Sequence, residues 1–246
     1  MNDREFEEHN RAKIEEMGKD DALREVSRQF LHRSVQQEYS YHFRWLGRPI
    51  IQYPQDVIAM QELIWQIKPD AIVETGIARG GSLIFYASML HLLGQDGIVV
   101  GVDIDVRPHN RVDIEAHPMA RYVQMIEGSS IDPDIVAEVR TRLASRKRVL
   151  VVLDSMHTHA HVLRELELYS PFVTNGSYLV VFDTCIEQLP ADLYPERPWG
   201  PGNNPWTATQ EFLRTTDRFV VDHAISDKLQ ITVAPDGYLK CVADQP

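Results

Sequence analysis

Short apolar runs alternate with amphipathic segments along most of the 246-residue chain. Runs rich in Val and Ile predict buried strands, and apolar residues at helical spacing predict helices between them. The expected strands are 71–74, 98–102, 121–126, 149–153, 177–182, 218–221, 229–234 and 238–242. The expected helices are 55–67, 83–93, 134–145, 160–169 and 206–216. Strands that alternate with helices are typical of right-handed βαβ units, so we expect an α/β domain with a mostly parallel sheet covered on both faces.

The N-terminal part of the chain lacks this alternation. Residues 1–38 are charged and helix-favouring with a modestly apolar face, which fits a solvated helical extension or a helix packed on a partner subunit or over the site. Residues 39–53 are rich in aromatic side chains and Arg, which fits a lid or rings buried on the main domain. We therefore expect a helical and aromatic N-terminal extension at 1–53, acting as a lid or oligomer contact, and a main domain at 54–246.

The amino-acid composition limits which partners the protein can bind and in which cellular compartment it is expected. The chain has 25 Lys and Arg against 36 Asp and Glu, a formal net charge of −11, which argues against nucleic acid as a partner. Cys185 and Cys241 give no disulfide framework and predict reduced thiols. The polar N-terminus lacks the apolar core of a signal peptide, and no run approaches the ~20 apolar residues of a membrane span. We expect a cytoplasmic protein that binds neither nucleic acid nor a membrane.

A glycine-rich turn joins one predicted strand to the helix that follows it, within Val73–Ser82. Gly76, Gly80 and Gly81 let the backbone approach a ligand, and the helix that begins near Ser82 presents free N–H groups. The spacing G-x-x-x-G-G differs from the dinucleotide fingerprint, and no Lys-Ser/Thr pair follows as in a phosphate loop. The turn therefore predicts a pocket for another adenosine-bearing ligand.

Four predicted strands end at or beside an acidic residue: Glu74, Asp103, Asp154 and Asp183. Ligands of parallel sheets bind beyond the carboxyl ends of the strands, so four acids on one rim indicate a site. Asp103 is placed to accept hydrogen bonds from both ribose hydroxyls of a nucleoside, with Asp105 as the alternative.

Glu74 and the pair Ser129 and Ser130 each allow two interpretations. Glu74 precedes the first glycine, where its carboxylate could hold a cationic ligand end or fix the loop through backbone N–H groups. Ser129 and Ser130 follow the third predicted strand and could meet an adenine edge, or they could serve the turn before the next helix.

Asp154 and Asp183 follow what should be neighbouring strands. Two converging carboxylates suit a hard cation, Mg²⁺ or Ca²⁺, with waters completing its shell, whereas two separate loop-capping acids are the alternative. His157 follows Asp154 by three residues and could take a proton from a substrate hydroxyl. A redox-metal site of Asp154, His157 and either His159 or His161 is also possible by residue type, although His159 and His161 are expected on the following helix.

A long Pro- and Gly-rich segment, Gln188 to Pro205, follows the acid-rich strands. A loop of this length within a compact domain is typical of a functional loop, and its place beside the acidic rim favours a substrate-facing one over a surface insertion.

Val73–Ser82 resembles the first motif of class I S-adenosylmethionine-dependent methyltransferases, and Gly101–Asp105 resembles their second. Residues ~50 to ~242 more closely resemble the cephalosporin hydroxylase-like group, which is related to sugar O-methyltransferases of antibiotic and rhamnosyl-glycolipid pathways. Further motifs that carry the resemblance are Leu153–His157, Phe182–Thr184, Arg197–Gly200, Asn203–Pro205 and Val233–Gly237.

The resemblance implies a Rossmann-like class I methyltransferase fold, with a seven-stranded, mostly parallel sheet whose last strand is reversed and with helices on both faces. It also implies S-adenosylmethionine in the glycine-turn pocket and, in many relatives, Mg²⁺. The donor-binding residues that we expect are Glu74, Gly76, Arg79, Gly80, Gly81, Ser82, Asp103, Ser129, Ser130 and Asp154.

The resemblance implies a catalytic set as well. Metal-using relatives hold the cation on an Asp after strand four and a pair of acids after strand five, with a His three residues beyond the first Asp as base; Asp154, His157 and Asp183 match these places. Phe182 departs from the pattern, because several metal-using relatives have an acid there. Thr184 or waters could then complete a metal site on Asp154 and Asp183.

We therefore expect an S-adenosylmethionine-dependent O-methyltransferase that acts on a hydroxyl group of a small polar or glycosylated metabolite and forms a homo-oligomer. His157 would be the base, with Asp154, Asp183 and Mg²⁺ assisting. The alternatives are a metal-dependent hydroxylase and a non-catalytic donor-binding subunit.

Overall fold

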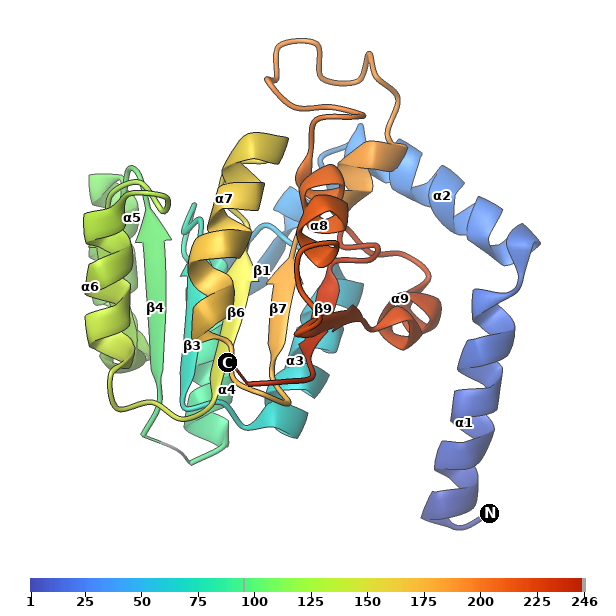
Figure 1. Cartoon of the computed structure of the whole chain (residues 1–246), viewed down its shortest axis with the longest axis horizontal. Helices are drawn as coiled ribbons and strands as arrows, with labels where there is room; N and C mark the ends of the chain where they lie inside the picture. Colours follow the sequence, from blue (N-terminus) through green and yellow to red (C-terminus); the bar gives the residue numbers. More distant parts are fainter. Residues whose placement is uncertain (95, 245–246) are drawn as a thin grey trace.

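The computed structural model describes residues 1–94 and 96–244 of the chain (Figure 1). The strands are β1 (Phe43–Trp45), β2 (Arg48–Ile50), β3 (Ala71–Thr75), β4 (Ile98–Asp103), β5 (Val123–Glu127), β6 (Val149–Leu153), β7 (Tyr178–Val181), β8 (Phe219–Val221) and β9 (Tyr238–Cys241). The α-helices are α1 (Asp3–Gly18), α2 (Asp21–Val35), α3 (Pro54–Ile67), α4 (Gly81–Leu92), α5 (Pro108–Glu115), α6 (Pro133–Leu143), α7 (His159–Tyr169), α8 (Pro205–Leu213) and α9 (His223–Leu229). Short 3-10 helices lie at Tyr39–His42, Ala120–Tyr122, Ser170–Phe172 and Thr184–Gln188.

Strands β3 to β9 form one seven-stranded sheet in the order β5-β4-β3-β6-β7-β9-β8. The pairs among β3, β4, β5, β6 and β7 are parallel, and β9 is antiparallel to both of its neighbours. Strands β1 and β2 form a separate antiparallel hairpin. The predicted parallel sheet with a reversed last strand and helices on both faces is confirmed.

The central strands are apolar on both faces because helices cover both faces. Ile72 of β3 belongs to the hydrophobic layer shared with α3 and α4, whereas its neighbour Val73 belongs to the layer shared with α6, α7 and α8. Figure 1 shows α7 and α8 in front of the sheet and α3 and α4 behind it. Both sides of the sheet are therefore closed to ligands, which leaves the strand ends as the place for a site.

The N-terminal helices α1 and α2 form an arm beside the sheet (Figure 1). Asn2 begins α1 with a capping box to Glu5, and α1 packs against α9 without burying any of its own residues. Phe6 and Val26 remain 53% and 63% exposed, so the arm presents apolar side chains to solvent. Within residues 1–94 and 96–244, no helix combines the length and the apolar character that a membrane crossing needs.

The aromatic segment 39–53 folds onto the main domain instead of standing free. Tyr53 is 2% exposed, and the Trp45 indole donates a hydrogen bond of 2.9 Å to Ser88 on α4. Tyr41 is 56% exposed, so burial of the rings is incomplete.

Two details of the fold differ from the prediction: one predicted strand near the C-terminus is not formed, and one helix between β4 and β5 was missed. The predicted strand 229–234 is absent; α9 ends at Leu229, and the Asp56 carboxylate of α3 accepts hydrogen bonds from the Val233 N–H and the Thr232 hydroxyl. These hydrogen bonds tie segment 229–234 to α3, and the apolar residues of the segment pack against the core without pairing with a strand of the sheet. The short helix α5 was not predicted, because only Ile114 and Asn110 of its residues are buried and its apolar pattern is weak.

Candidate active site

The predicted acidic residues gather where the parallel strands end. Asp103 is the last residue of β4, Asp154 follows β6 directly, and Asp183 follows β7 by two residues. Glu74 differs, since it lies within β3 and is fully buried. The Asp154 N–H donates to the Thr75 carbonyl at 2.9 Å, which continues the pairing of β3 and β6 to the rim.

A cavity of about 270 Å³ opens beyond the ends of β3, β4 and β6. The predicted donor-binding residues that line it are Gly76, Asp103, Ser129, Ser130 and Asp154. Ala78, Ile104, Met156 and His161 supply other parts of the wall. Those that do not line it are Glu74, Arg79, Gly80, Gly81 and Ser82. The cavity thus lies beside the glycine turn, bounded by three strand ends.

Asp103 fixes the glycine turn. One carboxylate oxygen accepts the N–H groups of Ile77 and Ala78 at 2.7 and 3.2 Å, and the other accepts the N–H of Asp105 at 3.1 Å. Two carboxylate oxygens offer about four acceptor positions, so Asp103 retains capacity for hydroxyl donors from a ligand. Asp105 itself is exposed and does not line the cavity.

The glycines of the turn serve contacts within the protein, in addition to the place of Gly76 on the cavity wall. Gly76 has φ of +92°, and a Cβ there would overlap the carbonyl of Asp154. A Cβ on Gly81 would overlap the carbonyl of Pro49, and one on Gly80 would overlap Ile114. These residues let neighbouring backbone and side chains close around the turn.

The glycine turn is also stabilised by hydrogen bonds at Glu74, Ser82 and Arg79. The Ser82 hydroxyl donates to Glu74 Oε2 at 2.6 Å, and burial raises the pKa of Glu74 to about 8. Glu74 therefore does not fix the loop through backbone N–H groups; its carboxyl group interacts instead with the hydroxyl groups of Ser82 and Tyr86. Arg79 is exposed and contributes its carbonyl, which accepts two hydrogen bonds from Arg48 of the hairpin.

Ser130 belongs to a polar network on one wall of the cavity. Its hydroxyl lies 3.1 Å from His161 Nε2, and that nitrogen lies 3.5 Å from Glu165 Oε1. Glu165 is fully buried and also accepts a hydrogen bond of 2.7 Å from Ser155. Ser129 lines the cavity and its carbonyl accepts the Asp132 N–H, so it takes part in the turn before α6 as well.

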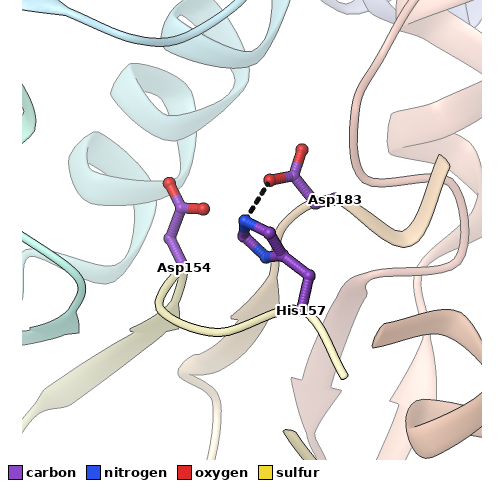
Figure 2. A group of neighbouring side chains, drawn as sticks. All are labelled: Asp154, His157 and Asp183. Carbon is purple, nitrogen blue, oxygen red and sulfur yellow. Dashed lines mark ion pairs between the residues drawn. The ribbon is translucent and has the colours of Figure 1, made fainter. Parts of the chain in front are cut away.

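Asp154, His157 and Asp183 converge beside this cavity (Figure 2). One ligand atom from each lies within 4.8 Å of the others, and His157 Nε2 is 3.2 Å from Asp183 Oδ2. Asp183 has a left-handed backbone with φ of 57°, a conformation that Asp adopts more often than most residues. Burial raises the pKa of Asp154 well above its usual range, and the negative charge of Asp183 raises it further.

A buried carboxylate beside a second one fits a divalent cation, because the ion would relieve both burial and repulsion. Phe182 packs in the hydrophobic core at 2% exposure, so it supplies no third ligand. Thr184 is fully buried, and its hydroxyl donates to the Pro235 carbonyl at 2.6 Å. The Thr184 hydroxyl proton is thus engaged within the protein, and the carboxylates that a cation here would meet are those of Asp154 and Asp183.

The redox-metal set with a second histidine is not assembled among the described residues. His159 joins α7 to α8, with its ring 2.8 Å from Thr207 Oγ1 and 3.1 Å from Glu211 Oε2. His161 lines the cavity with Ser130. Only His157 of the three histidines belongs to the cluster with the two aspartates.

The long loop reaches this cluster through Trp199. The Trp199 ring meets the His157 ring edge-on at 5.7 Å between centroids, and Tyr194 contacts the same tryptophan at 5.3 Å. Glu187 holds the end of the loop by accepting hydrogen bonds from the Gly202 N–H and the Asn204 amide. The Arg197–Gly200 motif does not itself indicate which ring Trp199 contacts, because the contact depends on how the loop folds back over the strand ends.

Gln52 is a site residue that the sequence did not reveal. Its Nε2 donates a hydrogen bond of 3.0 Å to Asp154 Oδ2 across 102 positions of the chain. No spacing rule connects residues so far apart when one of them lies outside the alternating βα pattern.

Comparison with known proteins agrees with this arrangement. Residues 37–242 match the family model described as Rhamnosyl O-methyltransferase/CmcI. The chain is 32% identical to the rhamnosyl O-methyltransferase of Mycobacterium bovis BCG over 193 residues, covering 75% of this chain and 72% of the relative. It is 31% identical to that of Mycobacterium leprae over 200 residues, covering 79% and 81% respectively.

A solved structure of CmcI with Mg and SAM superposes with a TM-score of 0.59 at 18% identity, covering 82% of this chain and 78% of that one. At this identity the superposition establishes a shared fold. The sequence match extends over most of both chains, and with the class I sheet it shows that the chain belongs to the rhamnosyl O-methyltransferase/CmcI family of S-adenosylmethionine-dependent methyltransferases.

Proposed function

We propose that this S-adenosylmethionine-dependent O-methyltransferase methylates a sugar-type hydroxyl group beside Asp154, His157 and Asp183. The observation that carries the proposal is the double position of Asp154, which lines the donor cavity and also belongs to the cluster. A donor in the cavity and an acceptor at the cluster would share this one wall. Such sharing suits a reaction in which the enzyme mainly aligns two reactants.

The donor would occupy the cavity against Gly76, Asp103, Ser129, Ser130 and Asp154. The carboxylate of Asp103 has about one acceptor position left beside its three backbone N–H groups, which fits one ribose hydroxyl. The remaining predicted residues would act by shaping the turn: Glu74, Arg79, Gly80, Gly81 and Ser82.

His157 would act as the base. As the acceptor oxygen bonds to the methyl carbon, the carbon–sulfur bond breaks, its electron pair returns to sulfur, and the hydroxyl proton passes to His157. Asp183, 3.2 Å from His157 Nε2, would stabilise the resulting imidazolium. When bound to Asp154 and Asp183, Mg²⁺ would orient the hydroxyl and lower its pKa.

The acceptor class follows from the relatives and from the loop. The curated relatives are named for a rhamnosyl acceptor, and Trp199 offers an aromatic side chain beside His157. An aromatic ring gives an apolar surface on which the C–H face of a sugar can pack. We extend this to a glycosylated or other small polyhydroxylated acceptor for the present chain.

We also propose a division into an N-terminal extension at 1–53 and a catalytic domain at 54–246, a homo-oligomer, and a cytoplasmic location. The exposed apolar side chains of α1 and α2 support an oligomer contact. Both cysteines are free thiols, as is usual in a reducing compartment.

The test is methyl transfer by the purified chain from isotope-labelled S-adenosylmethionine to rhamnosides and related glycosides, followed by mass spectrometry. Labelled O-methyl product with the chain alone supports the proposal. Donor binding without product from any hydroxyl acceptor would count against this acceptor class. Product that appears only after a second protein is added would indicate a donor-binding subunit.

A further inference from the structure

Ala78 has a backbone conformation that its own side chain disfavours, on the wall of the cavity beyond the strand ends. Its φ is positive, at 46°, and the residue lines the cavity. An alanine in this left-handed region brings its Cβ close to the following carbonyl oxygen, whereas a glycine adopts the region freely. Such a conformation persists only where the surrounding structure holds it, so the neighbours of Ala78 decide the shape of this wall.

Both backbone polar groups of Ala78 are held by side chains. The Ala78 N–H donates to Asp103 Oδ2 at 3.2 Å, and the Ala78 carbonyl accepts a hydrogen bond of 2.9 Å from Asn110 Nδ2. Asp103 ends β4 and so belongs to the sheet, whereas Asn110 lies on α5, outside the sheet. Asn110 is only 3% exposed, so packing fixes its side chain as well. The left-handed turn is thus held between the sheet and α5.

The two buried residues of α5 both meet the glycine turn. Asn110 and Ile114 are four positions apart and therefore lie on the same face of the helix. Asn110 binds the Ala78 carbonyl, and the Ile114 side chain fills the space that a Cβ on Gly80 would need. The buried face of α5 is therefore directed at the turn beside the cavity.

Arg48 of the β1–β2 hairpin fixes the orientation of the Asn110 amide. Arg48 Nη2 donates to Asn110 Oδ1 at 3.3 Å, and the guanidinium also pairs with Asp113 of α5. Arg48 Nε and Nη2 donate to the Arg79 carbonyl at 3.1 and 2.6 Å, which ties the hairpin to the turn as well. Since a guanidinium can only donate, the amide oxygen of Asn110 must face it, and the NH₂ group is left for the Ala78 carbonyl.

We propose that Asn110 is a positioning residue for the methyl donor, which holds the Ala78 carbonyl and so keeps the glycine turn in the left-handed shape that the donor cavity needs. Without this hydrogen bond, Ala78 would relax toward a negative φ and the cavity wall would shift. Asn110 does not line the cavity, so it acts through Ala78 and not by contact with the donor. The inference rests on the proposed function in one respect, because it needs the donor in this cavity.

Calorimetry with S-adenosylhomocysteine tests the inference without turnover. In the wild-type background, Asn110→Ala should weaken binding about fivefold, because the hydrogen bond that holds Ala78 is lost. In an Ala78→Gly background, the same change should weaken binding less than about twofold, since glycine keeps a positive φ without help. General destabilisation of the fold would act in both backgrounds alike. An equal loss in the two backgrounds, or no loss in the wild-type background, would overturn the inference.

Asp113→Ala is the matched control, because it removes another partner of Arg48 on the same helix and leaves both hydrogen bonds of Asn110 in place. Asp113 is 58% exposed, and its variant should bind S-adenosylhomocysteine within about twofold of wild type. A loss as large as that of Asn110→Ala would mean that only the docking of α5 matters, which contradicts the inference.

If Asn110→Ala fails to fold, Asn110→Asp carries the same pair of measurements. It keeps an oxygen for Arg48 but has no N–H group for the Ala78 carbonyl, so the same dependence on the Ala78→Gly background is expected. None of these affinities needs an acceptor. A chain that binds S-adenosylhomocysteine but methylates no hydroxyl group would therefore defeat the proposed function alone, whereas a wild type that does not bind it would defeat both.

Discussion

The proposed donor side of the site, around Asp103, and the proposed acceptor side, around His157, are built differently. On the donor side, Asp103 is bonded to three backbone N–H groups and the turn glycines are packed against protein. On the acceptor side, Asp154, His157 and Asp183 share one His–Asp contact and are approached by a long loop. The donor side is thus fixed by the main chain, whereas the acceptor side depends on side chains. Changes at His157 and Trp199, which do not line the cavity, should therefore alter turnover and leave donor binding intact.

The largest effect is expected for His157→Ala. Loss of a general base should lower kcat by about 10² to 10⁴-fold. Affinity for S-adenosylhomocysteine, measured by calorimetry, should stay at the wild-type value because His157 does not line the donor cavity. A variant that keeps its turnover would remove the base assignment, and one that loses donor binding would show that the two sides are not separate.

Glu74→Gln tests how the buried carboxyl group beneath the glycine turn makes the stability of the fold depend on pH. Burial raises the pKa of Glu74 to about 8 in the folded chain from 4.5 for a free side chain, so its contribution to stability is present below pH ~4.5 and is lost as pH rises through about 8. The loss for this group is at most about 5 kcal/mol. Denaturant unfolding between pH 5 and 9 should show a smaller decrease in the unfolding free energy for Glu74→Gln than for wild type. Parallel pH curves would mean that the Glu74 pKa is unshifted.

Asp103→Asn tests whether the donor side depends on its carboxylate. The change removes charge-assisted hydrogen bonds to the turn, with an expected loss of about 1.5–3 kcal/mol in donor binding, or roughly tenfold or more. Calorimetry with S-adenosylhomocysteine measures it. An unchanged affinity would mean that the turn holds the donor without Asp103.

Trp199→Ala should give the smallest effect and only on the acceptor side. Loss of an aromatic contact is worth about 0.5–1.5 kcal/mol, so KM for a glycoside should rise about two- to tenfold with KM for the donor unchanged. Trp199→Phe, which keeps a ring, is the matched control and should lie nearer to wild type. A rise in KM for the donor instead would mean that Trp199 contacts the donor and not the acceptor.

The sequence predicted the parts of the site that follow from parallel strands. Asp154 and Asp183 come after adjacent strands, so their approach follows from the βα pattern, and His157 follows from its spacing. Gln52 could not be predicted, because its contact depends on how the hairpin docks against α4. The packing contacts of the glycines could not be predicted for a similar reason: their neighbours, such as Pro49 and Ile114, are distant in sequence.

The left-handed backbone at Asp183 limits which amino acids can occupy this position. Asp, Asn and Gly adopt a positive φ readily, whereas other residues lose about 1–2 kcal/mol there. Among variants at position 183, the amount of folded protein should therefore depend on how readily the residue adopts a positive φ, whereas methyl transfer should depend on whether it keeps the carboxylate. Asn would preserve the backbone while removing the charge, so Asp183→Asn isolates the carboxylate in a way that Asp183→Ala cannot.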